Sequence, residues 1–263
     1  MDLGLTGKVA IITGGGEGIG RAAAHRIAAE GGAVLIIGRR AAVIEAAAAD
    51  INRATGGTVV PVPGDITDPA ARERLIGVAL EHFGRIDILV NNAGTSRAKP
   101  FEAVELEEWQ EDFDLKLWAA IALARAVIPQ MRRVGGGRII NVTNIGGRAP
   151  RAGSLPTTAA RAAGIAWTKA LSLDLAPDNI LVNTVCIGLI KSGQHERRYA
   201  RTAPQQNNLD VLYDEDAKKR GVPLGRVGEA HEAGDVIAFL ASERASYITG
   251  VAINIDGGSS PVP

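Results

Sequence analysis

The sequence is poor in cysteine and in net charge, and it lacks long apolar runs. Its one cysteine, Cys186, cannot form a disulfide within the 263-residue chain. Basic and acidic residues both number 29, which argues against a nucleic acid or a charged membrane surface as partner. No apolar run approaches the roughly 18 residues that span a bilayer, and the chain does not open like a signal peptide. We expect a cytoplasmic protein that acts on a small molecule and needs no metal.

Short apolar runs rich in β-branched residues alternate with longer stretches of helical periodicity. We predict strands at Val9–Thr13, Ala33–Ile37, Thr58–Val62, Ile86–Asn91, Arg138–Thr143, Ile180–Val185 and Val251–Ile255, and helices at Ile19–Glu30, Ala41–Asn52, Pro69–Phe83, Leu106–Arg133, Ser154–Ala176 and Glu229–Ser242. Such alternation is typical of a parallel sheet with right-handed crossovers, and continuous apolar strands are covered on both faces. The sequence predicts one α/β domain over residues 1–263, with a doubly wound parallel sheet of seven strands flanked by helices.

Residues 189–225 break this alternation, because they are polar and only weakly periodic. A connection of this length inside a compact domain is usually a lid or a binding loop, and we expect a substrate lid. Within it, His195 and Tyr199 are four residues apart and would share a helix face. Either is a candidate proton donor, although such charged runs are more often solvated helix faces. The basic residues around them would also suit the phosphates of an acyl-CoA substrate.

The first predicted strand runs directly into a glycine-rich turn, and a helix follows. The turn reads Gly14-Gly15-Gly16-Glu17-Gly18-Ile19-Gly20. Glycines permit the tight turn, let the backbone approach a pyrophosphate, and place that pyrophosphate at the positive helix N-terminus. In this strand–turn–helix context the string predicts a dinucleotide-binding site.

With Thr13, the turn resembles the fingerprint of the short-chain dehydrogenase/reductase family. The resemblance continues in register through Gly64-Asp65, Asn91-Asn92-Ala93-Gly94, Gly188 (where Ile187 replaces the family's proline) and Ile255-Asp256-Gly257-Gly258. It implies a Rossmann fold over nearly the whole chain and an NAD(P)(H)-dependent oxidoreductase. The implied cofactor contacts are Gly14, Gly16, Glu17, Gly18, Ile19, Gly20, Arg39, Asp65, Ile66, Asn92, Ala93, Gly94, Arg161, Gly188 and Ile190.

The end of the second predicted strand bears on cofactor choice. An acidic residue at Gly38 would bind the adenosine ribose and select NAD(H), whereas Arg39 can pair with the 2′-phosphate of NADP(H). Glu17 argues the other way, since its carboxylate would repel that phosphate. The alternative for Arg39 is a solvated helix start. We predict NADP(H), with NAD(H) left open.

The family's catalytic Ser, Tyr, Lys and upstream Asn are replaced here by Asn144, Thr157, Arg161 and Lys116. Thr157 has no pKa near neutrality and cannot be the usual proton donor, and Arg161 cannot relay protons. We therefore expect simple ketones to be reduced slowly. Lys116 and Arg161 facing the nicotinamide pocket would suit an enolate or thioester oxyanion, and related enoyl-CoA reductases also lack the tyrosine. Alternatively, Lys116 pairs with a local carboxylate and has no chemical role.

Three functions stay open at this stage. The first is reduction of an enoyl-thioester, another activated alkene or a carbonyl. The second is a cofactor-binding but redox-inactive subunit of a mixed oligomer, and the third is a non-redox lyase or isomerase. The resemblance also implies a homotetramer or homodimer, formed in large part through Leu106–Arg133 and Ser154–Ala176, which are apolar over more than one face.

Overall fold

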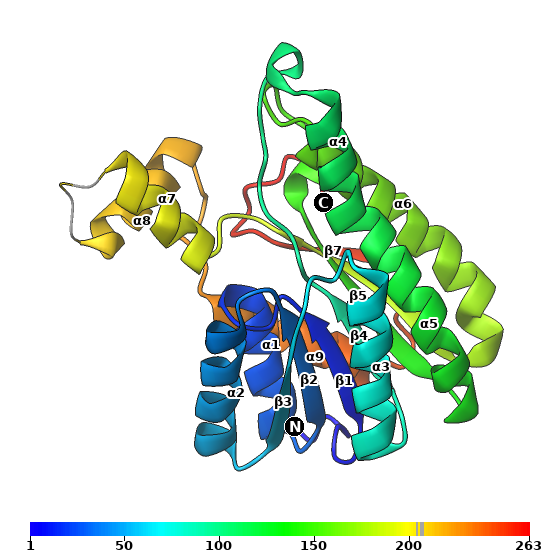
Figure 1. Ribbon diagram of the computed structural model, residues 1–263. Helices are drawn as coiled ribbons and strands as arrows, with labels where there is room; N and C mark the ends of the chain where they lie inside the picture. The colour runs from blue at the N-terminus through cyan, green and yellow to red at the C-terminus, as the bar shows by residue number, and fades with distance from the viewer. Residues whose placement is uncertain (204, 206–207) are drawn as a thin grey trace.

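A computed structural model describes residues 1–203, 205 and 208–263. Its centre is a seven-stranded sheet, parallel throughout, in the order β3-β2-β1-β4-β5-β6-β7 (Figure 1). The strands are β1 (Val9–Thr13), β2 (Ala33–Gly38), β3 (Thr58–Pro63), β4 (Ile88–Asn91), β5 (Gly137–Asn144), β6 (Ile180–Ile187) and β7 (Ala252–Ile255). Each predicted strand is present, and the predicted doubly wound sheet is confirmed.

Helices cover both faces of this sheet. They are α1 (Gly18–Ala29), α2 (Ala41–Thr55), α3 (Pro69–Phe83), α4 (Leu106–Phe113), α5 (Ala119–Arg133), α6 (Thr157–Leu175), α7 (Gly193–Thr202), α8 (Leu209–Arg220) and α9 (Ala230–Ala241), with short 3-10 turns at Phe101–Ala103, Ile145–Gly147, Ala176–Asp178 and Glu243–Ala245. One core cluster joins the sheet to α1, α2 and α9, and a second joins its other face to α3, α5 and α6. Cys186 is fully buried in β6, as a small apolar residue would be.

The predicted helical stretch Leu106–Arg133 begins and ends at the predicted residues, but it is not one regular helix. A π-helical turn at Asp114–Trp118 separates α4 from α5. A π turn inserts a residue into the helical ladder and is frequent at functional sites. Here it carries Lys116, which is buried.

The segment 189–225 contains two helices, α7 and α8, that stand out from the body of the molecule (Figure 1). They close a small apolar core of their own, made by Leu189, Tyr199, Leu212, Tyr213, Ala217, Val222 and Val227. Asn208 caps α8 and Gly221 ends it at φ +61°. The predicted lid includes residues 204, 206 and 207, which lie outside the described residues. No helix in the described part of the chain is long and apolar enough to cross a membrane.

Candidate active site

A cleft of about 1450 Å³ opens at the carboxyl end of the sheet. The strand order reverses between β1 and β4, which is where open α/β sheets bind their ligands. All the predicted cofactor residues except Gly20 line this cleft, and so do Asn144 and Thr157. Lys116 does not line it, which corrects the expectation that its ammonium faces the pocket.

The glycine turn forms the floor of the cleft. Gly14 adopts φ +67°, a left-handed conformation that glycine takes at little cost. Gly20 lies in the first turn of α1, where a Cβ would stand 2.4 Å from the Gly14 carbonyl oxygen and 2.5 Å from Nδ2 of Asn92. Gly20 therefore serves the close packing of α1 on the turn and contacts no cleft space of its own.

Hydrogen bonds lock the ends of β1 and β4 together beside this turn. The Thr13 hydroxyl accepts from the backbone N–H groups of Asn92 at 2.9 Å and Ala93 at 2.8 Å. In return, Nδ2 of Asn92 donates to the carbonyls of Thr13 at 2.9 Å and Gly14 at 3.2 Å. The backbone that would face a pyrophosphate is thus held before any ligand arrives.

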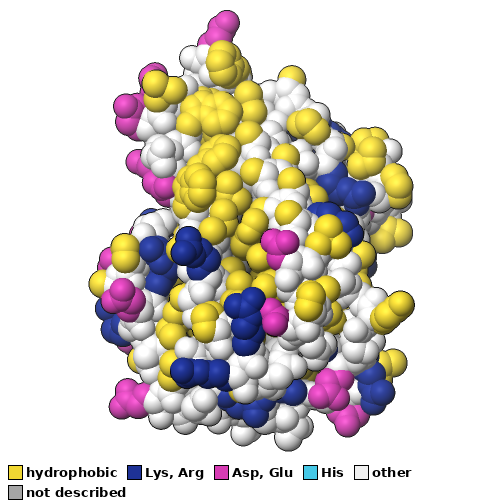
Figure 2. Space-filling view, turned by 90° about the vertical axis from the view of Figure 1, so that its right-hand side faces the viewer, with side chains coloured by type: hydrophobic (Ala, Val, Ile, Leu, Met, Phe, Trp, Pro, Cys, Tyr) yellow, Lys and Arg dark blue, Asp and Glu magenta, His cyan; other side chains and the backbone are white. Residues whose placement is uncertain are grey.

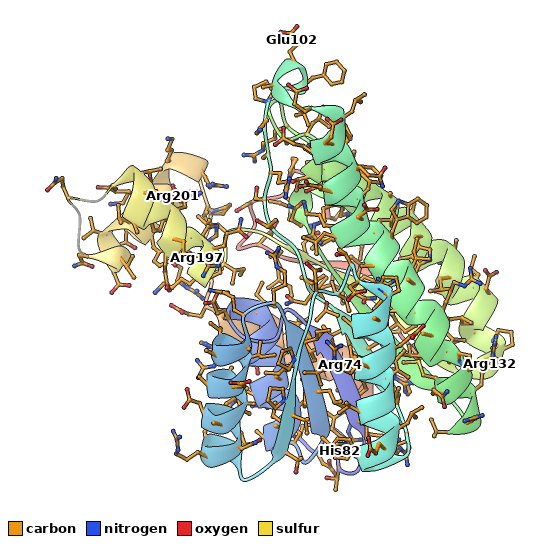
Figure 3. The ribbon with its side chains drawn as sticks, viewed as in Figure 1. Arg74, His82, Glu102, Arg132, Arg197 and Arg201 are labelled. Carbon is orange, nitrogen blue, oxygen red and sulfur yellow. The ribbon has the colours of Figure 1, made fainter. Side chains whose placement is uncertain are left out.

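Charged side chains surround the far end of the cleft, beyond the turn. Arg39 Nη1 lies 4.0 Å from Asp65 Oδ2, and the Arg39 side chain is 75% exposed. The Glu17 carboxylate is paired twice through Oε2, with Arg40 at 2.8 Å and with Arg197 at 2.8 Å. Arg197 lies on α7 (Figure 3). Although burial raises the pKa of Glu17, hydrogen bonds from the two arginines outweigh it and lower that pKa below 4.5. Two guanidinium groups thus offset the repulsion expected from Glu17.

Three replacement residues meet at the opposite end of the cleft. Asn144 ends β5, and Thr157 and Arg161 lie one turn apart at the start of α6. Arg161 Nη1 donates to the Val142 carbonyl at 2.6 Å, and its Nη2 packs against Gly94. Two of their buried polar atoms, Asn144 Oδ1 and Arg161 Nε, have no hydrogen-bond partner in the part of the chain that the structure describes.

The charge of Arg161 is poorly compensated. Burial lowers the pKa of its guanidinium to about 10, although Asp112 nearby opposes the shift. Arg161 therefore stays protonated at neutral pH, and a cation that lines the cleft favours negative charge beside it.

Lys116 lies behind Thr157 with a completely buried side chain. It forms an ion pair with Asp112, which is one helical turn earlier and equally buried, and its Nζ donates to Thr157 Oγ1 at 3.1 Å. Burial and the charge of Arg161 outweigh the Asp112 carboxylate and lower the pKa of Lys116 to about 8. Lys116 therefore has the local carboxylate partner that the alternative expectation gave it. It also donates a hydrogen bond to a residue of the site.

Sequence reasoning missed Asp112 altogether. The residue stands four positions before Lys116, a spacing that places two side chains together on a helix, so the signal was available. The second residue it missed, Arg97, contributes its backbone N–H, which donates to Thr157 Oγ1 at 3.1 Å. Nothing in side-chain chemistry points to such a contact.

Comparison with known proteins agrees with this geometry. A family model described as "Enoyl-(Acyl carrier protein) reductase" matches residues 14–260. A curated relative, the 3-oxoacyl-[acyl-carrier-protein] reductase of Aquifex aeolicus, is 33% identical over 98% of this chain and 99% of its own length. The chain belongs to the short-chain dehydrogenase/reductase family.

Solved structures of other family members superpose closely. L-Sorbose reductase from Gluconobacter frateurii, complexed with NADPH and L-sorbose, is 32% identical over all of both chains, with a TM-score of 0.95. An NADPH-bound short-chain oxidoreductase from Pseudomonas aeruginosa PAO1 that contains an atypical catalytic center is 31% identical over 97% of this chain and 98% of its own, with a TM-score of 0.90.

The sequence offered two candidate proton donors within residues 189–225. His195 lines the cleft, but Tyr199 does not. The Tyr199 hydroxyl donates to Asp216 Oδ2 at 2.7 Å, and burial together with that carboxylate raises the pKa of Tyr199 to about 12. Tyr199 is thus held inside the small core of α7 and α8 as a structural residue.

Proposed function

We propose that the protein is an NADP(H)-dependent reductase whose active site is the cluster of Asn144, Thr157 and Arg161. The observation that carries this proposal is the meeting of these three side chains at one end of a glycine-floored cleft, opposite a rim of arginines. None of the three is the family's usual serine, tyrosine or lysine, so the proposed site is non-standard.

The cleft fits a dinucleotide. The left-handed Gly14 shapes the turn, and Gly20 lets α1 pack closely against it, so the backbone of the turn and the N-terminus of α1 would face a pyrophosphate. At the far end, Arg39 would pair with the 2′-phosphate, and Asp65 and Ile66 would lie against the adenine. At the near end, Asn92, Ala93, Gly94, Gly188 and Ile190 would hold the nicotinamide half. When bound, such a cofactor supplies a hydride to a substrate carbon.

NADP(H) is favoured over NAD(H) by the charges around Glu17. The sequence alone set Glu17 against a 2′-phosphate, but the two arginines paired with it leave the rim net positive. The NADPH complexes of the sorbose reductase and the Pseudomonas aeruginosa oxidoreductase support the same cofactor for this chain.

The chemistry that suits this site is hydride addition to an activated alkene or carbonyl, such as an enoyl- or 3-oxoacyl-thioester. Hydride addition leaves negative charge on the substrate oxygen, and Arg161 offers a cation that lines the cleft and is fixed by its hydrogen bond to the Val142 carbonyl. Fixed donors aimed at developing charge usually contribute more than any other single effect to such catalysis. The acyl-carrier-protein reductase named among the relatives acts on a substrate of this kind.

The other two functions have less support. A lyase or isomerase using Lys116 as a Schiff-base amine would need that amine in the cleft, but the side chain has no exposed surface. A cofactor-binding but redox-inactive subunit is the function that competes with the proposed reductase, because such a subunit also requires an intact nucleotide cleft.

Fluorescence titration with NADPH and NADH, followed by turnover of crotonyl-CoA, acetoacetyl-CoA and simple ketones, tests the proposal. We expect tighter NADPH binding and NADPH oxidation with a thioester. Tight NADPH binding without oxidation by any substrate would favour the redox-inactive subunit instead.

We also propose that the protein is a homotetramer or homodimer, and that 189–225 is the substrate lid. Hydrophobic side chains gather on the face that carries α4 and α5 (Figure 2). Trp118 is 53% exposed at the start of α5, and Leu173 of α6 is 63% exposed. Exposed apolar surface of this kind marks an interaction site.

A further inference from the structure

The hydroxyl of Thr157 has an unusual set of partners. A threonine hydroxyl has two acceptor lone pairs and one proton to donate. Both lone pairs of Thr157 are engaged, one by the backbone N–H of Arg97 at 3.1 Å and one by Lys116 Nζ at 3.1 Å. Among the described residues no acceptor takes the hydroxyl proton, while Thr157 itself lines the cleft. Thr157 is only 3% exposed, and we infer that its hydroxyl proton is directed toward the cleft that it lines.

We propose that Asp112, Lys116 and Thr157 form a proton relay in which Lys116 is the proton source and Thr157 delivers the proton to the substrate. This inference rests on the proposed reduction and names the proton donor that the missing tyrosine leaves open. Thr157 is the catalytic residue, since it faces the cleft. Lys116 acts through it, and Asp112 positions Lys116.

The proton balance is simple. As the reduced substrate gains a proton on its oxygen, the O–H bond of Thr157 breaks. An N–H bond of Lys116 breaks at the same time and re-forms the O–H bond of Thr157. The products are a neutral substrate oxygen, an unchanged threonine and a neutral amine beside Asp112. Once product has left, Lys116 regains its proton from water through the same hydroxyl.

The relay removes the objection that Thr157 has no pKa near neutrality and cannot be the proton donor by itself. A threonine hydroxyl alone is too weak an acid to donate at neutral pH. With an ammonium hydrogen-bonded to its oxygen, however, no threonine alkoxide need form, because the hydroxyl loses and gains a proton in one step. The acid that matters is then Lys116.

The surroundings of Lys116 make it a usable acid. The charged groups that face it are Asp112 from α4, Arg161 from α6 and Arg97 from the segment after β4. Burial and the two arginines outweigh Asp112 and lower the pKa of Lys116 to about 8. A general acid is most efficient when its pKa lies near the working pH. The relay should therefore work below about pH 8 and fail as the pH rises through that value.

A measurement without substrate tests the relay. We would label the seven lysines with ¹³C at Cε and follow them by NMR against pH, with NADP⁺ absent and present, assigning Lys116 by its loss in Asp112→Asn/Lys116→Met. We expect a midpoint of about 8, a lower midpoint in Thr157→Val, which removes an acceptor, and an unchanged one in Thr157→Ser. A midpoint above about 10, or one that Thr157→Val does not move, would overturn the relay.

Turnover of crotonyl-CoA and acetoacetyl-CoA with NADPH provides the second arm. Lys116→Arg keeps a cation beside Asp112 but has no proton to give near neutrality. We expect Lys116→Arg and Asp112→Asn/Lys116→Met to lose about 10²- to 10⁴-fold in kcat, with NADPH binding retained as the check on folding. Asp112→Asn should shift the alkaline fall of kcat to lower pH, and Thr157→Ser should keep the profile. Wild-type kcat in Lys116→Arg would contradict the relay, because charge alone would then suffice.

The two arms separate the relay from the function on which it rests. If the wild-type protein oxidises NADPH with neither thioester, the proposed reduction fails, and the NMR midpoints still decide whether Lys116 is coupled to Thr157.

Discussion

At the scale of single residues, the cleft depends on a few residues whose surroundings do not tolerate a different side chain. Gly20 has no space for a methyl group, and Arg161 occupies a position where its charge has no local carboxylate partner at hydrogen-bond distance among the residues described. The side chain of Arg39, in contrast, is mostly exposed and makes one long ion pair. Substitutions of Gly20 and Arg161 should therefore be harmful, whereas Arg39 should be replaceable without harm to the fold.

Gly20→Ala should weaken both the fold and cofactor binding. The new methyl group would press on the Gly14 carbonyl and on Nδ2 of Asn92, and such overpacking typically costs about 1–3 kcal/mol. Thermal denaturation and NADPH titration would measure both effects. The matched control is Gly77→Ala in α3, where a Cβ meets nothing within 4 Å and stability should rise by about 0.5–1 kcal/mol. Equal behaviour of the two variants would refute this view of the turn.

Arg39→Asp should reverse cofactor preference. A carboxylate at this position would accept hydrogen bonds from the adenosine ribose of NADH and repel the 2′-phosphate of NADPH. Because the Arg39 side chain is 75% exposed, the melting temperature should not change. Paired fluorescence titrations would check the prediction, which is wrong if the wild-type protein already binds NADH more tightly.

At the scale of elements, the sequence predicted the helices and strands that have a clear local periodicity. The ends of Val9–Thr13 and Pro69–Phe83 were predicted to the residue, since an apolar run or a proline marks each start and a glycine follows each end. The helices α7 and α8 were missed, because their apolar residues pack on one another rather than on the sheet and leave weak periodicity. The π turn at Asp114–Trp118 was also missed, since its sequence contains no proline or glycine to mark a break in the helix.

The ion pairs of Glu17 tie α7 to the nucleotide turn, and Glu17→Gln should loosen α7. Replacing the carboxylate leaves Arg40 and Arg197 without their shared partner, so hydrogen exchange in Gly193–Thr202 should quicken, while NADPH should bind more tightly. Because the folded pKa of Glu17 is depressed, the wild-type contact is present above the unfolded pKa and is lost as pH falls through the folded pKa. Unchanged exchange in α7 in the variant would show that the small core alone holds this segment.

At the scale of the whole molecule, the site and the surface lie on different parts of one sheet scaffold. The cleft lies at the carboxyl ends of the strands, and the exposed apolar face lies over α4 and α5 (Figure 2). Assembly through that face would leave the cleft open. Sequence reasoning reached the fold and most of the cleft, because glycine turns and strand ends have local signatures. It could not place Lys116 behind Thr157, because that depends on how the π turn packs against α6.

Trp118→Glu should dissociate the assembly. A buried carboxylate without a partner is strongly unfavourable at an apolar interface, and the residue is 53% exposed in the single chain, so the protomer itself should fold. Light scattering at micromolar concentration should report a smaller species than for the wild type. Leu209→Glu on α8, where the side chain is 40% exposed, is the control and should leave the mass unchanged. A wild-type monomer would refute the proposed assembly.

The most direct test of the central claim is the rate at which NADPH is oxidised with crotonyl-CoA and acetoacetyl-CoA in the wild type and in Arg161→Gln. If the cluster of Asn144, Thr157 and Arg161 is the active site, the wild type turns over at least one thioester. Arg161→Gln should then lose about 10²- to 10³-fold in kcat, while Arg151→Gln, at an exposed arginine before α6 that does not line the cleft, loses nothing. Equal rates in the wild type and Arg161→Gln, or no oxidation by a wild type that binds NADPH tightly, would contradict the account.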